Sequence, residues 1–164
     1  VDQKNQITLL KSLNYLKNKI NFFAIIMGGG TLKNQLNDYI HKNNIQNKVK
    51  LINFANNPFP YIKQSDLFIL SSKYEGLPNV VLESIVLKKF VISSNCPTGP
   101  REILLNGKGG YLFPMGDYKK LAKKIVSFTK NQNECQRMLR NAYNQLSRFD
   151  QKKNLKKYLD LIIS

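Results

Sequence analysis

The chain has 164 residues, 42% of them hydrophobic, a length and composition typical of one globular domain. Its 26 lysine and arginine residues outnumber its 10 aspartate and glutamate residues, which gives a net charge of +16 at pH 7. The longest apolar runs, 22–27 and 79–87, are too short to cross a bilayer, and no charged leader precedes an apolar stretch, so we expect a cytosolic protein.

The first predicted element is an amphipathic helix over residues 5–19. Leu9, Leu13, Leu16 and Ile20 recur at helical spacing and form one apolar stripe. A continuous apolar run follows at 22–27 and ends at three glycines, Gly28 to Gly30. This pattern predicts a parallel strand covered by helices on both faces.

The alternation of strands and helices continues along the chain. We expect strands at 48–54, 67–70 and 90–93, and helices at 60–64 and 78–87. Such alternation predicts an α/β fold with a Rossmann-like open parallel sheet, whose ligands bind beyond the carboxyl ends of the strands. After Asp117 three lysine-rich helical segments are expected, so 117–164 forms the helical part of a single domain spanning 1–164.

The segment 75–83, Glu-Gly-Leu-Pro-Asn-Val-Val-Leu-Glu, joins a predicted strand to a predicted helix. Pro78 suits the first helical position, but Leu77 before it has no oxygen that could cap the helix. The backbone N–H groups of Asn79 and Val80 therefore lack a local acceptor, and an anion could bind them.

Glu83 is the single carboxylate of this predicted helix, which is apolar nearly all round. A buried carboxylate needs hydrogen-bond partners, and Glu83 lies four residues after Asn79, on the face that leads back to the uncapped end. It could accept hydrogen bonds from ligand hydroxyls, such as those of a ribose. The alternative is that Glu83 occupies an exposed edge of the helix and has no functional role.

Five segments follow one another along the chain: Lys4-Asn5, Met27-Gly28-Gly29-Gly30, the Glu-x7-Glu segment 75–83, the run 96–104 and Phe113-Pro114-x2-Asp117. Their order resembles that of the family-four retaining glycosyltransferases of the two-Rossmann-domain (GT-B) type, over nearly the whole chain. The run 96–104, Cys-Pro-Thr-Gly-Pro-Arg-Glu-Ile-Leu, resembles the polysaccharide-biosynthesis branch of that family.

The resemblance implies roles for individual residues. Lys4 would contact the diphosphate of a nucleotide-sugar donor, and Glu83 would bind the ribose hydroxyls. Glu75, the proposed catalytic residue, would hold the transferred sugar together with the backbone of Gly76, Leu77, Pro78 and Asn79, with Val80 at the helix terminus. The nucleotide base would lie near 54–57.

The resemblance also implies what a complete enzyme needs. An arginine in a Gly-Arg-Leu run, expected a few residues before Lys4, and an N-terminal acceptor-binding domain both lie outside this sequence. We therefore regard the chain as N-terminally truncated and expect it to transfer nothing alone. No Asp-x-Asp motif occurs, so we expect neither a metal nor a separate cofactor.

Other residues have plainer interpretations. Gly28 to Gly30 do not complete a Gly-x-Gly-x-x-Gly dinucleotide motif, which fails at Lys33. Gly99, Pro100 and Glu102 fit the start of a helix, and Arg101 is a secondary candidate for the rim of the donor site.

Neither the cysteines nor the histidine form a zinc-ligand set. We expect Cys96 and Cys135 to be free thiols and His41 to be solvated.

The lysine excess must favour polyanions at low salt. The lysines could simply be solvated; otherwise an anionic membrane surface suits them better than nucleic acid, because no aromatic residues are interleaved with them. The clusters are Lys119-Lys120, Lys123-Lys124, Lys152-Lys153 and Lys156-Lys157.

Together these observations predict a donor-binding domain that takes a hexose or N-acetylhexosamine from a UDP-sugar. The acceptor would be a glycan or a lipid-linked saccharide of bacterial surface polysaccharides, such as capsule or lipopolysaccharide. We expect no nucleic-acid partner, and a location in the cytoplasm or on the inner face of the membrane. The alternatives are a nucleotide-sugar epimerase on the same scaffold, or a basic nucleic-acid-binding α/β module.

Overall fold

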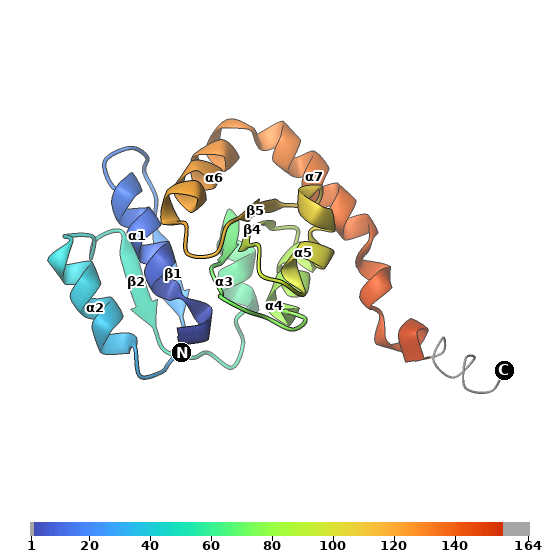
Figure 1. Ribbon diagram of the computed structural model, residues 1–164, viewed down its shortest axis with the longest axis horizontal. Coiled ribbons are helices and arrows are strands. Elements are labelled where there is room, and N and C mark those ends of the chain that lie inside the picture. Colours follow the sequence, from blue (N-terminus) through green and yellow to red (C-terminus); the bar gives the residue numbers. More distant parts are fainter. Residues whose placement is uncertain (1, 156–164) are drawn as a thin grey trace.

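The computed structural model describes residues 2–155, which form strands and helices in alternation (Figure 1). The strands are β1 (Ala24–Met27), β2 (Val49–Ile52), β3 (Leu67–Leu70), β4 (Phe90–Ser94) and β5 (Tyr111–Phe113). The α-helices are α1 (Gln6–Leu16), α2 (Lys33–Lys42), α3 (Phe59–Gln64), α4 (Asn79–Val86), α5 (Pro100–Ile103), α6 (Tyr118–Lys130) and α7 (Gln132–Asn144). Short 3₁₀ turns lie at Asp2–Lys4, Leu105–Gly107 and Leu146–Phe149, and residues 151–155 are helical.

All described strand pairs are parallel, as predicted, but their hydrogen bonds form two ladders. β1 pairs with β2, and separately β3, β4 and β5 follow one another in sequence order. The predicted elements are present, but β5 was not predicted. β3 has the predicted bounds, α3 and β4 are each one residue longer, and α1, β1, β2 and α4 are shorter than predicted. β5 has only three residues and follows two glycines, so it gives no strand pattern of its own.

Strand β4 has helices on both faces. Phe90 and Ile92 pack toward α6, while Val91, on the opposite face, packs with residues of α4 and α5. All five residues of β4 are buried, so this strand matches the expectation for a continuous apolar run.

Strand β1 differs from this expectation. Ile26 is buried among α1 and α2, but Ile25 on the other face is 45% exposed. Ile25 lies opposite Lys50 of β2, which is also exposed. The prediction that helices cover both faces of this strand is therefore wrong for the described residues, because they cover only the Ile26 face.

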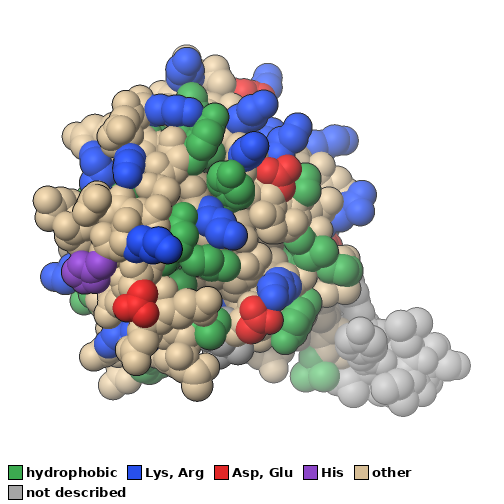
Figure 2. All heavy atoms as spheres, turned by 60° about the vertical axis from the view of Figure 1, so that its left-hand side comes forward, with side chains coloured by type: hydrophobic (Ala, Val, Ile, Leu, Met, Phe, Trp, Pro, Cys, Tyr) green, Lys and Arg blue, Asp and Glu red, His purple; other side chains and the backbone are tan. Residues whose placement is uncertain are grey.

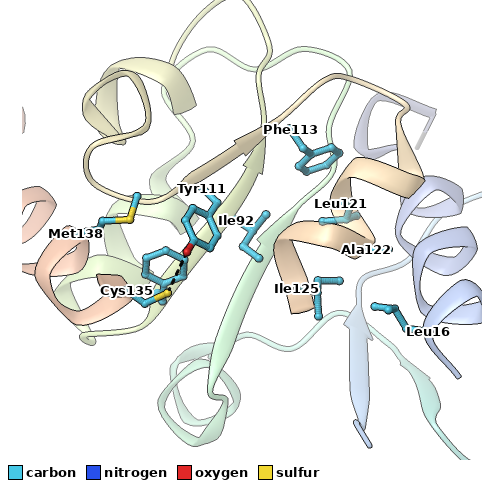
Figure 3. Close-up of a cluster of buried hydrophobic side chains, with 10 residues drawn as sticks. Leu16, Ile92, Tyr111, Phe113, Leu121, Ala122, Ile125, Cys135 and Met138 are labelled. Atoms are coloured by element: carbon cyan, nitrogen blue, oxygen red, sulfur yellow. Dashed lines mark hydrogen bonds between the residues drawn. The ribbon is translucent and has the colours of Figure 1, made fainter. Parts of the chain in front are cut away.

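Helix α1 contributes to two parts of the core. Leu10 and Leu13 pack with residues of β1, β2 and α2, whereas Leu16 packs beside α6. Figure 3 shows Leu16 next to Leu121, Ala122 and Ile125 of α6. This helix therefore joins the β1–β2 part of the fold to the β3–β5 part.

The core cluster that contains Leu16 and the α6 residues also includes polar groups, at Tyr111 and Cys135. The hydroxyl of Tyr111 lies 3.7 Å from Cys135 Sγ (Figure 3). It also lies 3.4 Å from Glu134 Oε2. Burial, followed by these two neighbours, raises the pKa of Tyr111, and burial raises the pKa of the Cys135 thiol. Cys96 is buried as well, and both cysteines are free thiols, as predicted.

Candidate functional site

The candidate site lies at the carboxyl ends of the parallel strands, where the chain start meets the loop after β3. The backbone N–H of Lys73 donates to the carbonyl of Gln3 at 2.8 Å, and Ser71 Oγ donates to the carbonyl of Lys4 at 2.9 Å. Gln3 Nε2 also donates to the carbonyl of Tyr74 at 3.1 Å. These bonds hold Lys4 beside Glu75, although 71 residues separate them in the sequence.

Lys4, Ser72 and Glu75 form a hydrogen-bonded cluster. Lys4 Nζ lies 2.8 Å from Glu75 Oε1, and Ser72 Oγ donates to the same oxygen at 2.6 Å. The Glu75 side chain is 7% exposed, whereas that of Lys4 is 45% exposed. Within residues 2–155, Oε2 of Glu75 has no hydrogen-bond partner, so it can accept from a ligand.

The loop after β4 supports the segment that follows Glu75. Thr98 Oγ1 donates to the carbonyl of Glu75, and Gly99 lies directly against Gly76 and Pro78. Gly99 has φ +77°, and a Cβ atom there would lie 2.6 Å from Pro78 Cδ and closer still to the Gly76 carbonyl oxygen. Only glycine fits this approach without a shift of one loop.

Buried serines join the ends of β3 and β4. Ser94 Oγ donates to the carbonyl of Ser72 at 2.6 Å, and both residues are buried. Because each buried hydroxyl has a partner, this pair stabilises the backbone below Glu75.

The N-terminus of α4 is uncapped, as predicted, but it begins one residue later. Pro78 is the N-cap residue and makes no side-chain cap, so Asn79 is the first helical residue. Pro78 adopts an extended conformation, ψ 95°, which a first helical residue does not have. The first backbone N–H groups of an α-helix have no hydrogen-bond acceptor within the helix, and the N–H of Asn79 is one of these groups. Gly76 and Leu77 are exposed beside them, and Val80 is half-buried.

Glu83 lies one turn into α4 and is half-buried, so the expectation of a buried carboxylate is wrong. The buried residues of this helix are Val81, Ser84 and Ile85, which leaves Glu83 at the boundary of the buried face. Glu83 makes no side-chain hydrogen bond or ion pair within the part of the chain that the structure describes.

A shallow depression of about 20 Å³ lies beside the glycine turn, at the same carboxyl edge of the strands. Gly28, Gly29, Gly30, Gln6 and Lys33 contribute to its lining. Lys33 Nζ lies 2.7 Å from Asn53 Oδ1, which places a cation between the ends of β1 and β2. The predicted base loop, 54–57, follows Asn53, and Phe54 is 76% exposed there.

Several polar residues of the site were missed in the sequence. The signal that could have indicated them is their position after the carboxyl ends of predicted strands. The residues are Ser72, Thr98 and Lys33.

The plainer predictions agree with the structure. Gly99 is the N-cap residue of α5 and Pro100 its first residue, with Glu102 two residues later. Arg101 Nε donates to Asn106 Oδ1 at 3.0 Å, and its place at the rim of the donor site stays a prediction. His41 is exposed, as predicted.

A model of the family described as glycosyl transferases group 1 matches residues 1–145. The chain belongs to this family. The match confirms the resemblance found in the sequence and favours a transferase over an epimerase or a nucleic-acid-binding module.

Similar proteins include two curated glycosyltransferases. The chain is 47% identical over 104 residues to an uncharacterized glycosyltransferase of Methanocaldococcus jannaschii. This match covers 63% of this chain and 26% of the relative. It is 26% identical over 172 residues to the UDP-Gal:α-D-GlcNAc-diphosphoundecaprenol α-1,3-galactosyltransferase of Escherichia coli, covering 99% of this chain and 44% of the relative. The chain thus spans less than half the length of these relatives.

The chain also shares its fold with a protein of known structure. HepE of Anabaena, crystallised in complex with UDP, superposes with a TM-score of 0.86 at 21% sequence identity, over 99% of this chain and 46% of HepE. This likeness confirms the predicted α/β fold class. No helix among residues 2–155 is long and apolar enough to span a membrane.

Proposed function

We propose that this chain is the donor-binding domain of a retaining glycosyltransferase that takes a hexose or N-acetylhexosamine from a UDP-sugar. The observation that carries the proposal is the Lys4–Ser72–Glu75 cluster beside the uncapped N-terminus of α4. A cation, free helix amides and a carboxylate together suit a ligand that joins a diphosphate to a sugar.

Lys4 would bind the diphosphate. Its ammonium has three N–H donors, one of which goes to Glu75, and the side chain is half-exposed. Lys4 can therefore donate to a phosphate oxygen while it keeps Glu75 in place. The amides at the start of α4 would add to the stabilisation of the departing UDP, which is electrostatic catalysis by preorganised donors.

Glu75 and Glu83 would bind different parts of the donor. The unpartnered Oε2 of Glu75 would accept from a hydroxyl of the transferred sugar, and the half-buried Glu83 would accept from the ribose. Gly76, Leu77, Pro78 and Asn79 would line the sugar site through their backbone.

The acceptor would be a glycan or lipid-linked saccharide of bacterial surface polysaccharides, bound by a further domain on the cytoplasmic side. The name of the Escherichia coli relative, which acts on a diphosphoundecaprenol-linked sugar, supports this acceptor class. The UDP complex of HepE supports the nucleotide.

Calorimetry with UDP and with UDP-glucose or UDP-N-acetylglucosamine tests the proposal on the parent chain, Glu75→Ala and Glu83→Ala. Glu83→Ala should weaken UDP binding by about 1.5–3 kcal/mol, the range for a hydrogen bond to a charged group, and Glu83→Gln by less. Glu75→Ala should spare UDP and weaken only the UDP-sugar. The matched control is Asp38→Ala, which removes the negative charge of an exposed side chain on α2. The ribose assignment fails if Glu83→Ala binds UDP like the parent.

A further inference from the structure

A groove lies between the C-terminal part of α1 and helix α6, away from the candidate site. It has a volume of about 450 Å³, within the range of small-molecule sites. Leu16, Ala122 and Val126 contribute apolar surface, and the other lining residues are Tyr15, Lys19, Lys123, Ser127, Lys130 and Asn131. Three lysines therefore rim an opening whose exposed surface is mainly apolar.

The two helices that form this groove carry charge of one sign. Neither α1 nor α6 contains an aspartate or glutamate; the adjoining acidic residues are Asp117, which caps the N-terminus of α6, and Glu134 in the first turn of α7. The contact with Lys19, followed by the charges of Lys119 and Lys123, lowers the pKa of the Tyr15 hydroxyl. Figure 2 shows that lysine and arginine side chains far outnumber acidic ones on the face of the molecule turned forward there.

The groove and the candidate site lie at opposite ends of α1. Lys4 precedes the helix, and Tyr15 lies eleven residues later, which corresponds to about 16 Å along the axis. Since β1 starts just after this end of α1, the groove lies toward the amino ends of the strands. A partner bound there leaves the carboxyl-edge loops open to a donor.

We propose that the α1–α6 groove docks the protein onto a membrane surface rich in anionic lipid. Lysine ammonium groups at the rim attract lipid phosphates, and the apolar floor contacts the acyl boundary. A single-stranded nucleic acid fits less well, because it needs open aromatic faces for stacking. Here the Tyr15 ring is covered by Lys19 Nζ, 3.5 Å from its centroid, and its edge packs against Tyr118.

Sedimentation with vesicles made of equal parts phosphatidylglycerol and phosphatidylcholine, and with pure phosphatidylcholine vesicles, tests the groove. The protein should bind only the anionic vesicles and dissociate as salt rises. The triple variant Lys19→Gln/Lys123→Gln/Lys130→Gln should lose about a hundredfold in affinity, since each lysine near such a surface contributes about fivefold. Lys123→Glu gives a second variant with a single exposed change.

The matched control is Lys42→Gln/Lys50→Gln/Lys63→Gln, three exposed lysines on other elements, which leaves the same net charge. An equal loss in both triple variants would mean diffuse attraction and would overturn the proposal, as would equal binding to neutral vesicles. Binding of a single-stranded RNA without binding of vesicles would also overturn it. UDP-sugar affinity, measured in parallel, should be unchanged in both variants, so failure of the donor site is distinguished from failure of the groove.

Discussion

Replacement of Gly99 by alanine tests whether the contact between the two loops positions the donor segment. Gly99 has φ +77° and ψ −79°, outside the left-handed helical region, and an L-residue held in such a sparsely populated conformation costs about 1–3 kcal/mol. The new Cβ would lie 2.6 Å from Pro78 Cδ, against about 3.5 Å for ordinary carbon contacts, and closer still to the Gly76 carbonyl oxygen, so the Gly76–Pro78 segment must move by at least about 1 Å. Such overpacking adds about 1–3 kcal/mol, so the expected loss of unfolding free energy is about 2–6 kcal/mol.

The assay combines urea denaturation with calorimetric titration of UDP-glucose. A shift of about 1 Å at a positioned site can cost about a hundredfold in function, so donor affinity should fall by tenfold or more. Gly107→Ala is the control, because Gly107 also has positive φ, +91°, but a Cβ there meets only Leu112 Cδ1 at 4.0 Å. The control should show the backbone cost alone and keep donor affinity. Parent-like affinity in a folded Gly99→Ala variant would refute the role of this contact.

Two further predictions concern buried charge and pH. Lys4→Ala should lower the unfolding free energy by about 1 kcal/mol, less than for a fully buried pair because Lys4 is half-exposed, and in a Glu75→Gln background it should cost almost nothing. Thermal melts of the four proteins check this; an equal cost in both backgrounds would contradict it. Because burial raises the pKa of Tyr111, this side chain ionises at lower pH in the unfolded protein than in the folded protein. The free energy of unfolding is therefore unaffected by Tyr111 ionisation below about pH 10 and should fall above about pH 10, by up to about 1.4 kcal/mol per pH unit. Urea denaturation at rising pH should show a smaller fall for Tyr111→Phe but not for Tyr15→Phe; equal slopes in the parent and Tyr111→Phe would rule it out.

The alternation of strands and helices could be predicted from the sequence because most elements carry their own pattern. Residues 67–70 are an apolar run between polar ends, and they form β3 over the same residues. The three residues of β5 carry no such pattern, since pairing with β4 decides their conformation. The exposure of Ile25 could not be predicted either, because an apolar run does not say which face another element will cover.

The sequence named candidate site residues, whose roles stay predictions, but it could not give their contacts. The resemblance named Lys4 and Glu75 for different parts of the donor, while the structure brings them together in one ion pair. Ser72 and Thr98 hold Glu75 through its carboxylate and its carbonyl, and serine and threonine are too common in loops to be singled out. Glu83 looked buried because its neighbours in sequence are apolar, yet the buried face of α4 is narrower than the apolar run.

Helix α1 connects the two proposals physically. Its start is held by hydrogen bonds from Ser71 and Lys73 to the chain at Gln3 and Lys4, which fixes Lys4 beside Glu75. Its end, at Leu16, is buried against α6 and forms one wall of the lysine groove. Buried packing anchors this helix along its length. A partner bound in the groove would therefore contact the same rigid helix that Lys4 precedes. Because the two candidate sites lie at opposite ends of α1, this helix is a direct structural connection between them.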